Sequence, residues 1–560
     1  MSMSSRSESR KRWIPLPARP RCVGLTAPLL AAVGVSLVAP FLPQKAGAAD
    51  HGNALPNIVI IYADDLGYGD LSCYHSKCAY KTPRLDQMAA EGIRFTDAHS
   101  PSTICSPSRY GLFSGQQIYR STGGGGGAFE GPGGPSYLKP GTLTLGDMLR
   151  EKGYRTGVFG KWHVGLTWLD KEGKRLGGGF ENSLLIDYAK STPLIDGPNA
   201  RGFDESFITP NCPGTDPLYV YIENGMVPVP ASQRHHRDDL PNPGGKWRWD
   251  NDEGWMAPGY EFVKADLLFY DKTRQFITGH RKHHPGQPFF AVFSTQIAHA
   301  PVLPAPEFNG TTDAGPRGDF VRELDTLVGR VLDLVKELGI DEETLILFNA
   351  DNGAETVHVD WMRRDHDHDP SGGWRGMKRD AWEGGHRVPF IARWPGRIPR
   401  GQVSGQMTNT TDIFATLASV VGYQLPDHVA TDSFDLLPAM LGTQEDSKPI
   451  RPHLLTQSFR GEFQIRQGSW KYLDHPGSGG NNYDQAPLKR YALPESAPGA
   501  PGQLFDLAKD PGETTNLYFT EAAKRSELQA LLEQLKSSGR SAPRNRMPIG
   551  IEHIPKLGKP

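Results

Sequence analysis

Short runs of apolar residues recur along the chain and predict buried strands. The first covers residues 57–62, where Asn-Ile-Val-Ile-Ile-Tyr combines continuous hydrophobicity with β-branched side chains. Such a run is typical of a strand buried on both faces, because a strand with one wet face would alternate apolar and polar residues. Comparable runs predict further strands at residues 156–159, 289–293, 344–348 and 388–394.

Segments with the apolar spacing of helices lie between these runs. Apolar residues fall three and four positions apart over residues 321–338, which is the pattern of an amphipathic helix. Further helices are predicted at residues 85–91, 143–152 and 413–421. Strands that alternate with helices over this length predict an α/β fold with a large sheet sandwiched by helices. Ligand sites in such folds lie beyond the carboxyl ends of the strands.

The pattern changes near residue 445. Short strands are predicted at residues 463–467 and 469–473, followed by a polar loop and an amphipathic helix near 526–536. We therefore predict a larger domain over residues 50–445, a smaller α+β domain over 446–540 and a basic tail over 541–560. A length of 560 residues also favours two or more domains.

The first 48 residues resemble an export signal. A basic lead precedes an apolar stretch at residues 23–42, and Ala46-Gly47-Ala48 offers a small-residue cleavage site. The alternative is an uncleaved membrane anchor, but Pro28 and Pro40 favour a cleaved signal. No later segment is apolar enough to span a bilayer. We therefore predict a periplasmic or secreted protein with no stable membrane span after signal removal.

Net charge and cysteine content reduce the number of possible functions. The formal net charge of −2 gives no indication of nucleic-acid binding. Cys73 and Cys78 are close enough in sequence for a local disulfide in an oxidising compartment, and Cys212 is predicted to be simply buried. The sequence contains no Cys-x-x-Cys pair, so its cysteine spacing does not indicate a zinc site.

Two acidic clusters directly follow predicted strands. Asp64-Asp65 comes after the first strand, where the alternative interpretation is a solvated turn. Asp351-Asn352-Gly353 follows the strand at residues 344–348 in the same way. Neighbouring carboxylates repel each other unless a cation neutralises them. Because these ligands are oxygens, the two clusters predict one shared calcium or magnesium ion rather than zinc.

Several motifs share one family's order along the chain. Residues 105–115 begin with Cys-Ser-Pro-Ser-Arg and continue to Leu112-Phe113-Ser114-Gly115. Gly-Lys-Trp-His stands at 160–163, Gln-Ile-Ala-His-Ala-Pro at 296–301, and Arg-Gly-Met-Lys with Trp-Glu-Gly-Gly-His-Arg-Val-Pro at 375–389. Together they resemble the type I, formylglycine-dependent sulfatases of arylsulfatase type. Ala298 stands where that family more commonly has Pro.

The resemblance implies a fold, a cofactor and residue roles. The fold would be alkaline-phosphatase-like, with a large mixed sheet and a smaller C-terminal α+β domain. Cys105 would be oxidised to formylglycine by a formylglycine-generating enzyme or its equivalent. One calcium ion would be bound by Asp64, Asp65, Asp351, Asn352 and the modified Cys105. The implied catalytic residues are Arg109 at the formylglycine hydrate, Lys161 at the sulfate, His163 at the hydrate hydroxyl, His299 at the leaving alcohol or the sulfate, and Lys378 at the ester oxygen and sulfate.

The implied activity is hydrolysis of sulfate monoesters. The substrate would be a sulfated polysaccharide or glycosaminoglycan, with aryl sulfates as surrogates. Two alternatives stay open: a phosphate or phosphonate ester hydrolase on the same fold, and a secreted glycan-binding protein with an unmodified Cys105. Glu383 is predicted to be structural, bonding backbone amides at the glycine turn, and residues 363–369 to form a solvated or substrate-facing loop. Five tryptophans could stack on sugar rings or pack locally: Trp168, Trp247, Trp249, Trp255 and Trp374.

Overall fold

The apolar run at residues 57–62 forms the middle of a large sheet in the computed structural model, which describes residues 54–557 except 125, 130–131, 216, 237–238 and 240–252. Strand β1 (Asn57–Ala63) lies between β10 (Thr344–Ala350) and β9 (Phe289–Ser294) and pairs in parallel with both. Its side chains alternate between two hydrophobic cores, one on each face of the sheet. This double burial explains why the strand is apolar throughout.

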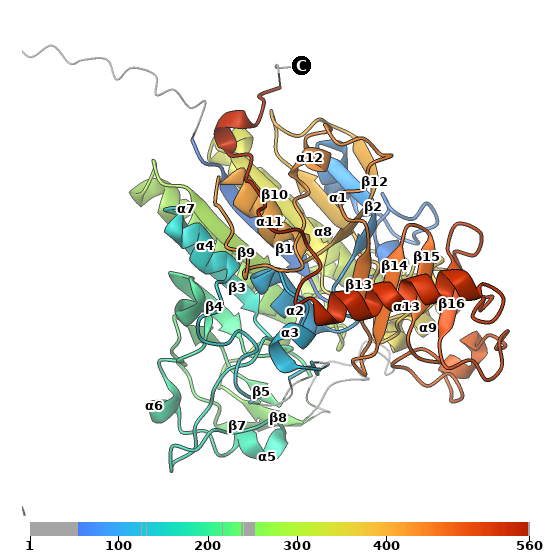
Figure 1. Ribbon diagram of the computed structural model, residues 1–560. Coiled ribbons are helices and arrows are strands. Elements are labelled where there is room, and N and C mark those ends of the chain that lie inside the picture. The colour runs from blue at the N-terminus through green and yellow to red at the C-terminus, as the bar shows by residue number, and fades with distance from the viewer. Residues whose placement is uncertain are drawn as a thin grey trace, which may run out of the picture. The chain divides into compact units, whose positions relative to one another are not determined.

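The sheet is mixed and has nine strands among the described residues (Figure 1). The pairs β3·β9, β3·β4 and β2·β12 are parallel, whereas β11 runs antiparallel to both of its neighbours and β6 runs antiparallel to β4. The strands lie in the order β12 (Gln402–Asn409), β2 (Ile93–His99), β11 (Phe390–Arg393), β10, β1, β9, β3 (Arg155–Lys161), β4 (Glu205–Thr209) and β6 (Ile222–Glu223).

Helices cover both faces of this sheet (Figure 1). One face carries α1 (Pro83–Ala90), α7 (Ala265–His283) and α8 (Gly315–Glu337), whose apolar residues share a core with Val59 and Ile61. The other face carries α2 (Cys105–Ser114), α4 (Leu145–Glu151) and α11 (Asp412–Val420). The predicted α/β sandwich is confirmed. None of the helices in the described part of the chain is long and apolar enough to cross a membrane.

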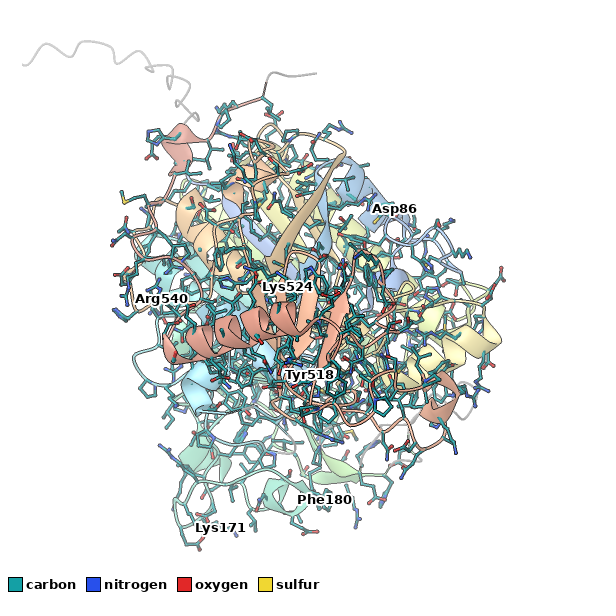
Figure 2. The ribbon with its side chains drawn as sticks, turned by 45° about the vertical axis from the view of Figure 1, so that its right-hand side comes forward. Asp86, Lys171, Phe180, Tyr518, Lys524 and Arg540 are labelled. Atoms are coloured by element: carbon teal, nitrogen blue, oxygen red, sulfur yellow. The ribbon has the colours of Figure 1, made fainter. Side chains whose placement is uncertain are left out.

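A second, smaller sheet follows the change in pattern near residue 445. It is antiparallel, with the order β13 (Leu454–Gln457), β14 (Phe463–Gln467), β15 (Trp470–Leu473) and β16 (Gln503–Asp506). Helix α13 (Ala522–Ser537), which carries Lys524, packs on β14 and β15, and its leucines join Tyr518 in a separate core (Figure 2). Residues 541–557 pack back on the larger core through Ile551 and Ile554.

The remaining elements are short. The helices are α3 (Tyr119–Thr122), α5 (Phe180–Ser183), α6 (Tyr188–Ser191), α9 (Thr356–Asp365), α10 (Glu383–His386) and α12 (Leu437–Met440). A three-stranded sheet has the order β5 (Leu218–Tyr219), β8 (Gly254–Met256) and β7 (Gln233–His235).

The sequence predictions for regular elements are confirmed where apolar runs are long, and incomplete elsewhere. Strands β1, β3, β9, β10 and β11 and helices α1, α4, α8 and α11 form at the predicted places. The sequence analysis did not predict β2, β12 or α7. Strand β2 reads Ile-Arg-Phe-Thr-Asp-Ala-His. Its polar residues interrupt the apolar run by which the other strands were predicted. The predicted signal over residues 1–48 lies outside the described residues.

Candidate active site

The two acidic turns meet at the carboxyl ends of β1 and β10. Asp64 and Asp65 immediately follow β1, and the Asp65 backbone N–H donates to Asp351 Oδ1 over 3.1 Å. Asn352 Nδ2 donates to Asp65 Oδ1 over 2.6 Å. All four side chains are fully buried. The predicted convergence of the two clusters is therefore present in the structure.

Tight backbone contacts hold the second turn in place. A Cβ on Gly353 would lie 1.9 Å from the carbonyl oxygen of Gly384, so only glycine fits there. The Gly353 N–H also donates to the Gly385 carbonyl over 3.0 Å. The turn after β10 is thus packed directly on the glycine turn of the segment that carries Lys378.

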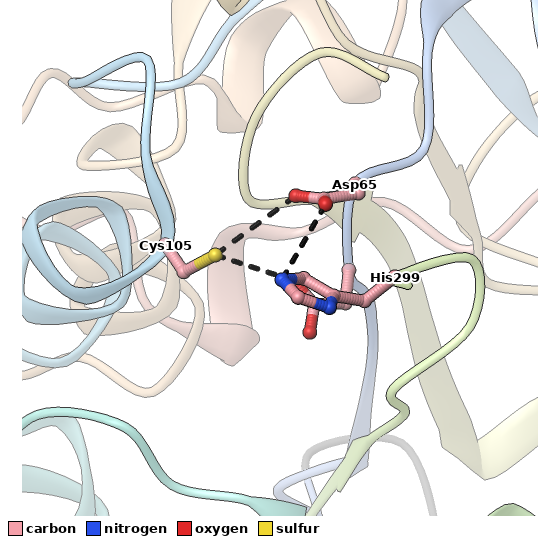
Figure 3. A group of neighbouring side chains, drawn as sticks. Asp65, Cys105 and His299 are labelled. Carbon is pink, nitrogen blue, oxygen red and sulfur yellow. Dashed lines mark hydrogen bonds and ion pairs between the residues drawn. The ribbon is translucent and has the colours of Figure 1, made fainter. Parts of the chain in front are cut away.

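Cys105 is the first residue of helix α2 and faces the acidic pair. Its Sγ lies 3.4 Å from Asp64 Oδ1 and 3.9 Å from Asp65 Oδ1. Single ligand atoms of Asp64, Asp65, Cys105 and His299 all lie within 4.8 Å of one another. Figure 3 shows Cys105 and His299 approaching Asp65 from different segments. A hydrogen bond with the Cys212 thiol and burial raise the pKa of the Cys105 thiol.

Arg109 lies one helical turn after Cys105, as its spacing predicts. Its guanidinium contacts Asp351 Oδ2 over 3.0 Å through Nε and 2.9 Å through Nη2, and Asp64 Oδ1 over 3.7 Å. Nη1 donates to the Lys161 carbonyl over 3.0 Å. Arg109 is buried and is therefore more than a surface cation: it orients two of the predicted metal ligands.

Two buried lysines each pair with one carboxylate of the acidic pair. Lys161 ends β3 and pairs with Asp64 Oδ2, while Lys378 Nζ lies 2.7 Å from Asp65 Oδ2 and 3.4 Å from Glu355 Oε2. A Cβ on Gly160, beside Lys161, would lie 1.8 Å from the Ser294 carbonyl oxygen on β9. Both ammonium groups therefore converge on the acidic pair next to Cys105.

Two histidines and a second thiol complete the group. His299 Nε2 lies 3.1 Å from Lys378 Nζ and 3.6 Å from Asp65 Oδ2, and its Nδ1 bonds the Ala300 carbonyl. His163 Nε2 bonds the Phe129 carbonyl over 3.0 Å. Cys212 Sγ lies 3.5 Å from His299 Nε2 and 3.9 Å from His163 Nδ1. The thiol of Cys212 thus connects the two imidazoles.

The acidic cluster has the properties of a hard-cation site. Asn352 Oδ1 is buried and has no hydrogen-bond partner among the residues that the structure describes. A buried amide oxygen is costly without a partner, and it is a ligand that calcium accepts. Together with the carboxylates of Asp64, Asp65 and Asp351, it gives the all-oxygen donor set expected for calcium. The residues present therefore fit the ion that the sequence predicts.

The electrostatics of the cluster favour a bound cation. Burial and the nearby Asp64 carboxylate hold the pKa of Asp351 well above its usual range. Burial also opposes ionisation of Asp64, but Lys161, His299 and Arg109 together hold its pKa well below the usual value. Burial and Lys378 lower the pKa of His299, and the carboxylates of Asp65 and Asp64 outweigh them and raise it to about 9. A divalent cation would let all these carboxylates ionise together.

Two expectations about neighbouring residues are wrong, and one question that the sequence left open is answered. Glu383 does not bond backbone amides: its carboxylate contacts the Lys471 ammonium over 3.0 Å and the Arg387 guanidinium over 3.0 Å. Residues 363–365 belong to helix α9, and His368 is buried, so this stretch is not simply a solvated loop. Cys73 and Cys78 are thiols, without the local disulfide considered from their spacing.

The tryptophans divide into different environments. Trp168 is completely buried in the larger core, so it cannot stack on a sugar. Trp255 and Trp374 are half-buried. Trp247 and Trp249 lie outside the described residues. The sugar-stacking hypothesis is therefore excluded for Trp168 alone.

Sequence reasoning missed two residues of the site. Cys212 was expected to be merely buried, and no pattern in its surroundings connects it with Cys105. Arg317, on α8, is completely buried and donates to the Ala298 carbonyl over 3.0 Å and the Asp65 carbonyl over 3.3 Å. Its counter-ion is Asp70, whose Oδ2 lies 2.6 Å from Nη2. Arg317 lies in the first turn of α8, before the helix predicted over residues 321–338, so no sequence signal connected it with the site.

Known proteins are similar to this chain in sequence. The family model described as Sulfatase matches residues 56–423. An N-acetylgalactosamine-6-O-sulfatase of Bacteroides thetaiotaomicron is 32% identical over 86% of this chain and 93% of its own length. Arylsulfatase A of Homo sapiens is 33% identical over 86% of this chain and 87% of its own.

Solved structures have the same fold. A structure described under the metabolism of multiple glycosaminoglycans by Bacteroides thetaiotaomicron has a TM-score of 0.71 and 28% identity, covering 87% of this chain and 100% of that one. A phosphonate monoester hydrolase of Agrobacterium radiobacter, with a TM-score of 0.52 and 18% identity over 86% of this chain and 96% of its own, shares the fold alone. The predicted alkaline-phosphatase-like fold is confirmed.

Proposed function

The chain belongs to the sulfatase family, and from that premise we propose that it removes sulfate from a sulfated glycosaminoglycan, using a formylglycine made from Cys105 and one bound calcium ion. The observation that carries this proposal is the convergence of Cys105, the acidic turns and two buried lysines on one point. The named activity of the Bacteroides thetaiotaomicron relative supports a 6-O-sulfated N-acetylgalactosamine unit as the first substrate to test.

The residues that surround Cys105 are suited to a sulfate ester. Lys161, Lys378 and Arg109 place three permanent positive charges around the cluster, which would offset the negative charge that an ester sulfate brings into a buried site. Their counter-ions in the structure are the predicted calcium ligands. Calcium held by those carboxylates would leave the two ammonium groups available to sulfate oxygens.

The two absent groups would add chemistry that the unmodified chain lacks. A formylglycine hydrate would supply the nucleophilic hydroxyl, and calcium would add positive charge beside the sulfate. Asp64, Asp65, Asp351 and Asn352 would bind the ion. His299 is held by the Ala300 carbonyl through Nδ1, which leaves Nε2 to face the ester and hold the proton for the leaving alcohol.

A phosphonate or phosphate ester hydrolase remains the second candidate, because the Agrobacterium radiobacter enzyme shares the fold. The stronger likeness to named sulfatases favours sulfate. Export to the periplasm or the medium is part of the same proposal, since glycosaminoglycans are extracellular polymers too large to cross a membrane unaided. A formylglycine-generating enzyme would be the maturation partner.

Substitution of Cys105 is the direct test. In Cys105→Ala we expect sulfate release from a 6-O-sulfated N-acetylgalactosamine oligosaccharide and from an aryl sulfate to fall to background, with an unchanged melting temperature. Mass spectrometry of the wild-type Cys105 peptide should show an aldehyde, and activity lost on chelation should return with calcium. Retained activity in Cys105→Ala, or faster hydrolysis of phosphonate than of sulfate esters by wild type, would contradict the proposal.

A further inference from the structure

A second thiol lies beside Cys105 in the candidate active site. Cys212 belongs to the segment after β4, far along the chain from the start of α2. Its Sγ lies 3.5 Å from His299 Nε2, and the Cys105 sulfur lies within 4.8 Å of the same imidazole. The Cys212 thiol is also the largest influence on the pKa of the Cys105 thiol, which it raises. Two cysteines distant in sequence therefore place their sulfurs beside the same imidazole.

We propose that Cys105 and Cys212 form a disulfide in chains whose Cys105 has not been oxidised to formylglycine. A disulfide needs a sulfur separation of about 2.05 Å and paired Cα atoms within about 7 Å. Cys105 is fixed at the start of α2, whereas Cys212 lies outside any regular helix or strand. The Cys212 segment can therefore supply the movement that brings the two neighbouring thiols into a covalent bond.

The chemistry requires a low-molecular-weight disulfide as oxidant. The Cys212 sulfur attacks one sulfur of the oxidant, forming a mixed disulfide and releasing one thiol, which takes up the proton. The Cys105 sulfur then attacks the Cys212 side of the mixed disulfide and releases the second thiol. The two cysteines lose two electrons and two protons in total, and the oxidant gains them as two thiols. An oxidising compartment supplies such disulfides.

The bond would keep the precursor inactive but recoverable. It holds the sulfur of Cys105, so that sulfur is unavailable for conversion to the aldehyde, and it draws a side chain across the space beside His299. A thiol reductant would reverse it and restore Cys105 for maturation. The cross-link itself depends only on the two thiols, and its effect on activity rests on the proposed conversion of Cys105.

Peptide mapping without reduction tests the bond. The full chain would be produced without a formylglycine-generating enzyme, incubated with oxidised glutathione, alkylated under denaturing conditions and digested. We expect one cross-linked pair of peptides that contains Cys105 and Cys212 and disappears after dithiothreitol. In Cys212→Ser the pair should be absent and Cys105 fully alkylated.

The matched control is Cys73→Ser, which removes a thiol away from the site and should leave the yield of the Cys105–Cys212 pair unchanged. The inference is overturned if both cysteines of the oxidised wild-type chain are recovered alkylated, or each joined to glutathione alone. Chains co-produced with a formylglycine-generating enzyme provide a separate readout, because absence of the aldehyde there contradicts the proposed function and leaves the cross-link test intact.

Discussion

Two buried clusters, one around Asp64 and the other around Glu383, contain the histidines and carboxylates that metals use, yet their hydrogen bonds differ. In the Glu383 cluster, His99 Nε2 bonds Asp97 over 2.9 Å, and the Nδ1 atoms of His99 and His386 lie 3.0 Å apart. Lys471 Nζ lies 3.3 Å from His386 Nε2.

These contacts determine the tautomers in the Glu383 cluster. Asp97 can only accept, so His99 carries its proton on Nε2 and accepts at Nδ1 from His386. His386 then accepts at Nε2 from Lys471. Burial lowers the pKa of both histidines, in keeping with two neutral rings. Every ring nitrogen has a partner, so no lone pair is left for a metal.

The cluster around Asp64 is the opposite case. Asn352 Oδ1 has no partner among the described residues, and burial together with the Asp64 carboxylate disfavours ionisation of Asp351. The types of side chain in a cluster therefore do not identify a metal site. What identifies it is whether acceptor atoms remain without hydrogen-bond partners. The Glu383 cluster instead joins the small sheet to the larger domain. Lys471 lies on β15 of the small sheet, and Glu383 begins α10, which follows Lys378 in the larger domain.

The largest effect should separate the two clusters by activity. We expect Lys378→Met to lower kcat for an aryl sulfate by about 10³-fold, because the sulfate loses a buried cation that cannot be replaced by water. The measurement is steady-state kinetics with the folded fraction checked by circular dichroism. The matched control is the equally buried Lys471→Met, which should lower stability while kcat changes by less than about threefold. Similar losses of kcat in both variants would refute the division.

Substitution in the Glu383 cluster should lower the stability of the fold. Glu383→Gln removes the carboxylate that pairs with both Lys471 and Arg387, whose remaining partners are Glu513 and Asp97. Removal of one partner from a buried ion pair costs about 3–5 kcal/mol. We expect that loss in urea unfolding, with a control in Glu445→Gln, whose exposed pair with Lys448 should contribute less than about 0.5 kcal/mol. Comparable unfolding midpoints for the two variants would show that the cluster does not fasten the sheets.

The sequence predicts the parts of the site that follow strands. Asp64, Asp65, Asp351 and Lys161 each come at the carboxyl end of a buried apolar run, and the sheet order then brings them together. The position of these residues depends only on where each strand ends, and the apolar runs in the sequence indicate those ends. The roles of the individual side chains came from the family resemblance rather than from the pattern.

The remainder depends on contacts that no local pattern encodes. Cys212 reaches His299 from an irregular segment, and Arg317 reaches the Asp65 and Ala298 carbonyls from the first turn of α8, outside the predicted helix. Lys471 and Arg466 complete the Glu383 cluster from the small sheet. Each contact joins residues separated by tens to hundreds of positions, and only the three-dimensional packing determines it.

The two clusters should also respond oppositely to pH. Cations hold the pKa of Glu383 well below its usual range despite burial, so its contribution is present above about pH 4 and is lost in acid. Behind the catalytic turn, Asp266 accepts from the Gln296 N–H over 2.9 Å, and burial raises its pKa to about 7. The unfolded chain loses that proton near pH 4, so stability falls as the pH rises from about 4 to 7.

Asp266→Asn tests the second half of that contrast. Between pH 5 and 7 the wild type should lose about 2–3 kcal/mol of unfolding free energy relative to this variant, at roughly 1.4 kcal/mol for each pH unit. Other titrating groups cancel in the difference between the two proteins. The measurement is urea unfolding at both pH values. A difference that stays constant from pH 5 to 7 would mean that Asp266 is ionised throughout.

The smallest effect concerns Trp374, at the border of the Glu383 cluster. The Arg387 guanidinium lies 3.8 Å from its ring centroid and is held there by Glu383 and Asp97. One face of the indole is thus already occupied by a cation, and that leaves less surface for a sugar ring. We expect Trp374→Leu to lower the unfolding free energy by about 1 kcal/mol, the usual size of a partly buried cation–π contact.

The KM for a sulfated oligosaccharide should then change by less than twofold, and Trp374→Phe should recover part of the lost stability because it keeps a ring under the guanidinium. A tenfold rise in KM with unchanged stability would reverse the assignment: the indole would contact the substrate, and the Glu383 cluster would border the binding site as well as joining the two sheets.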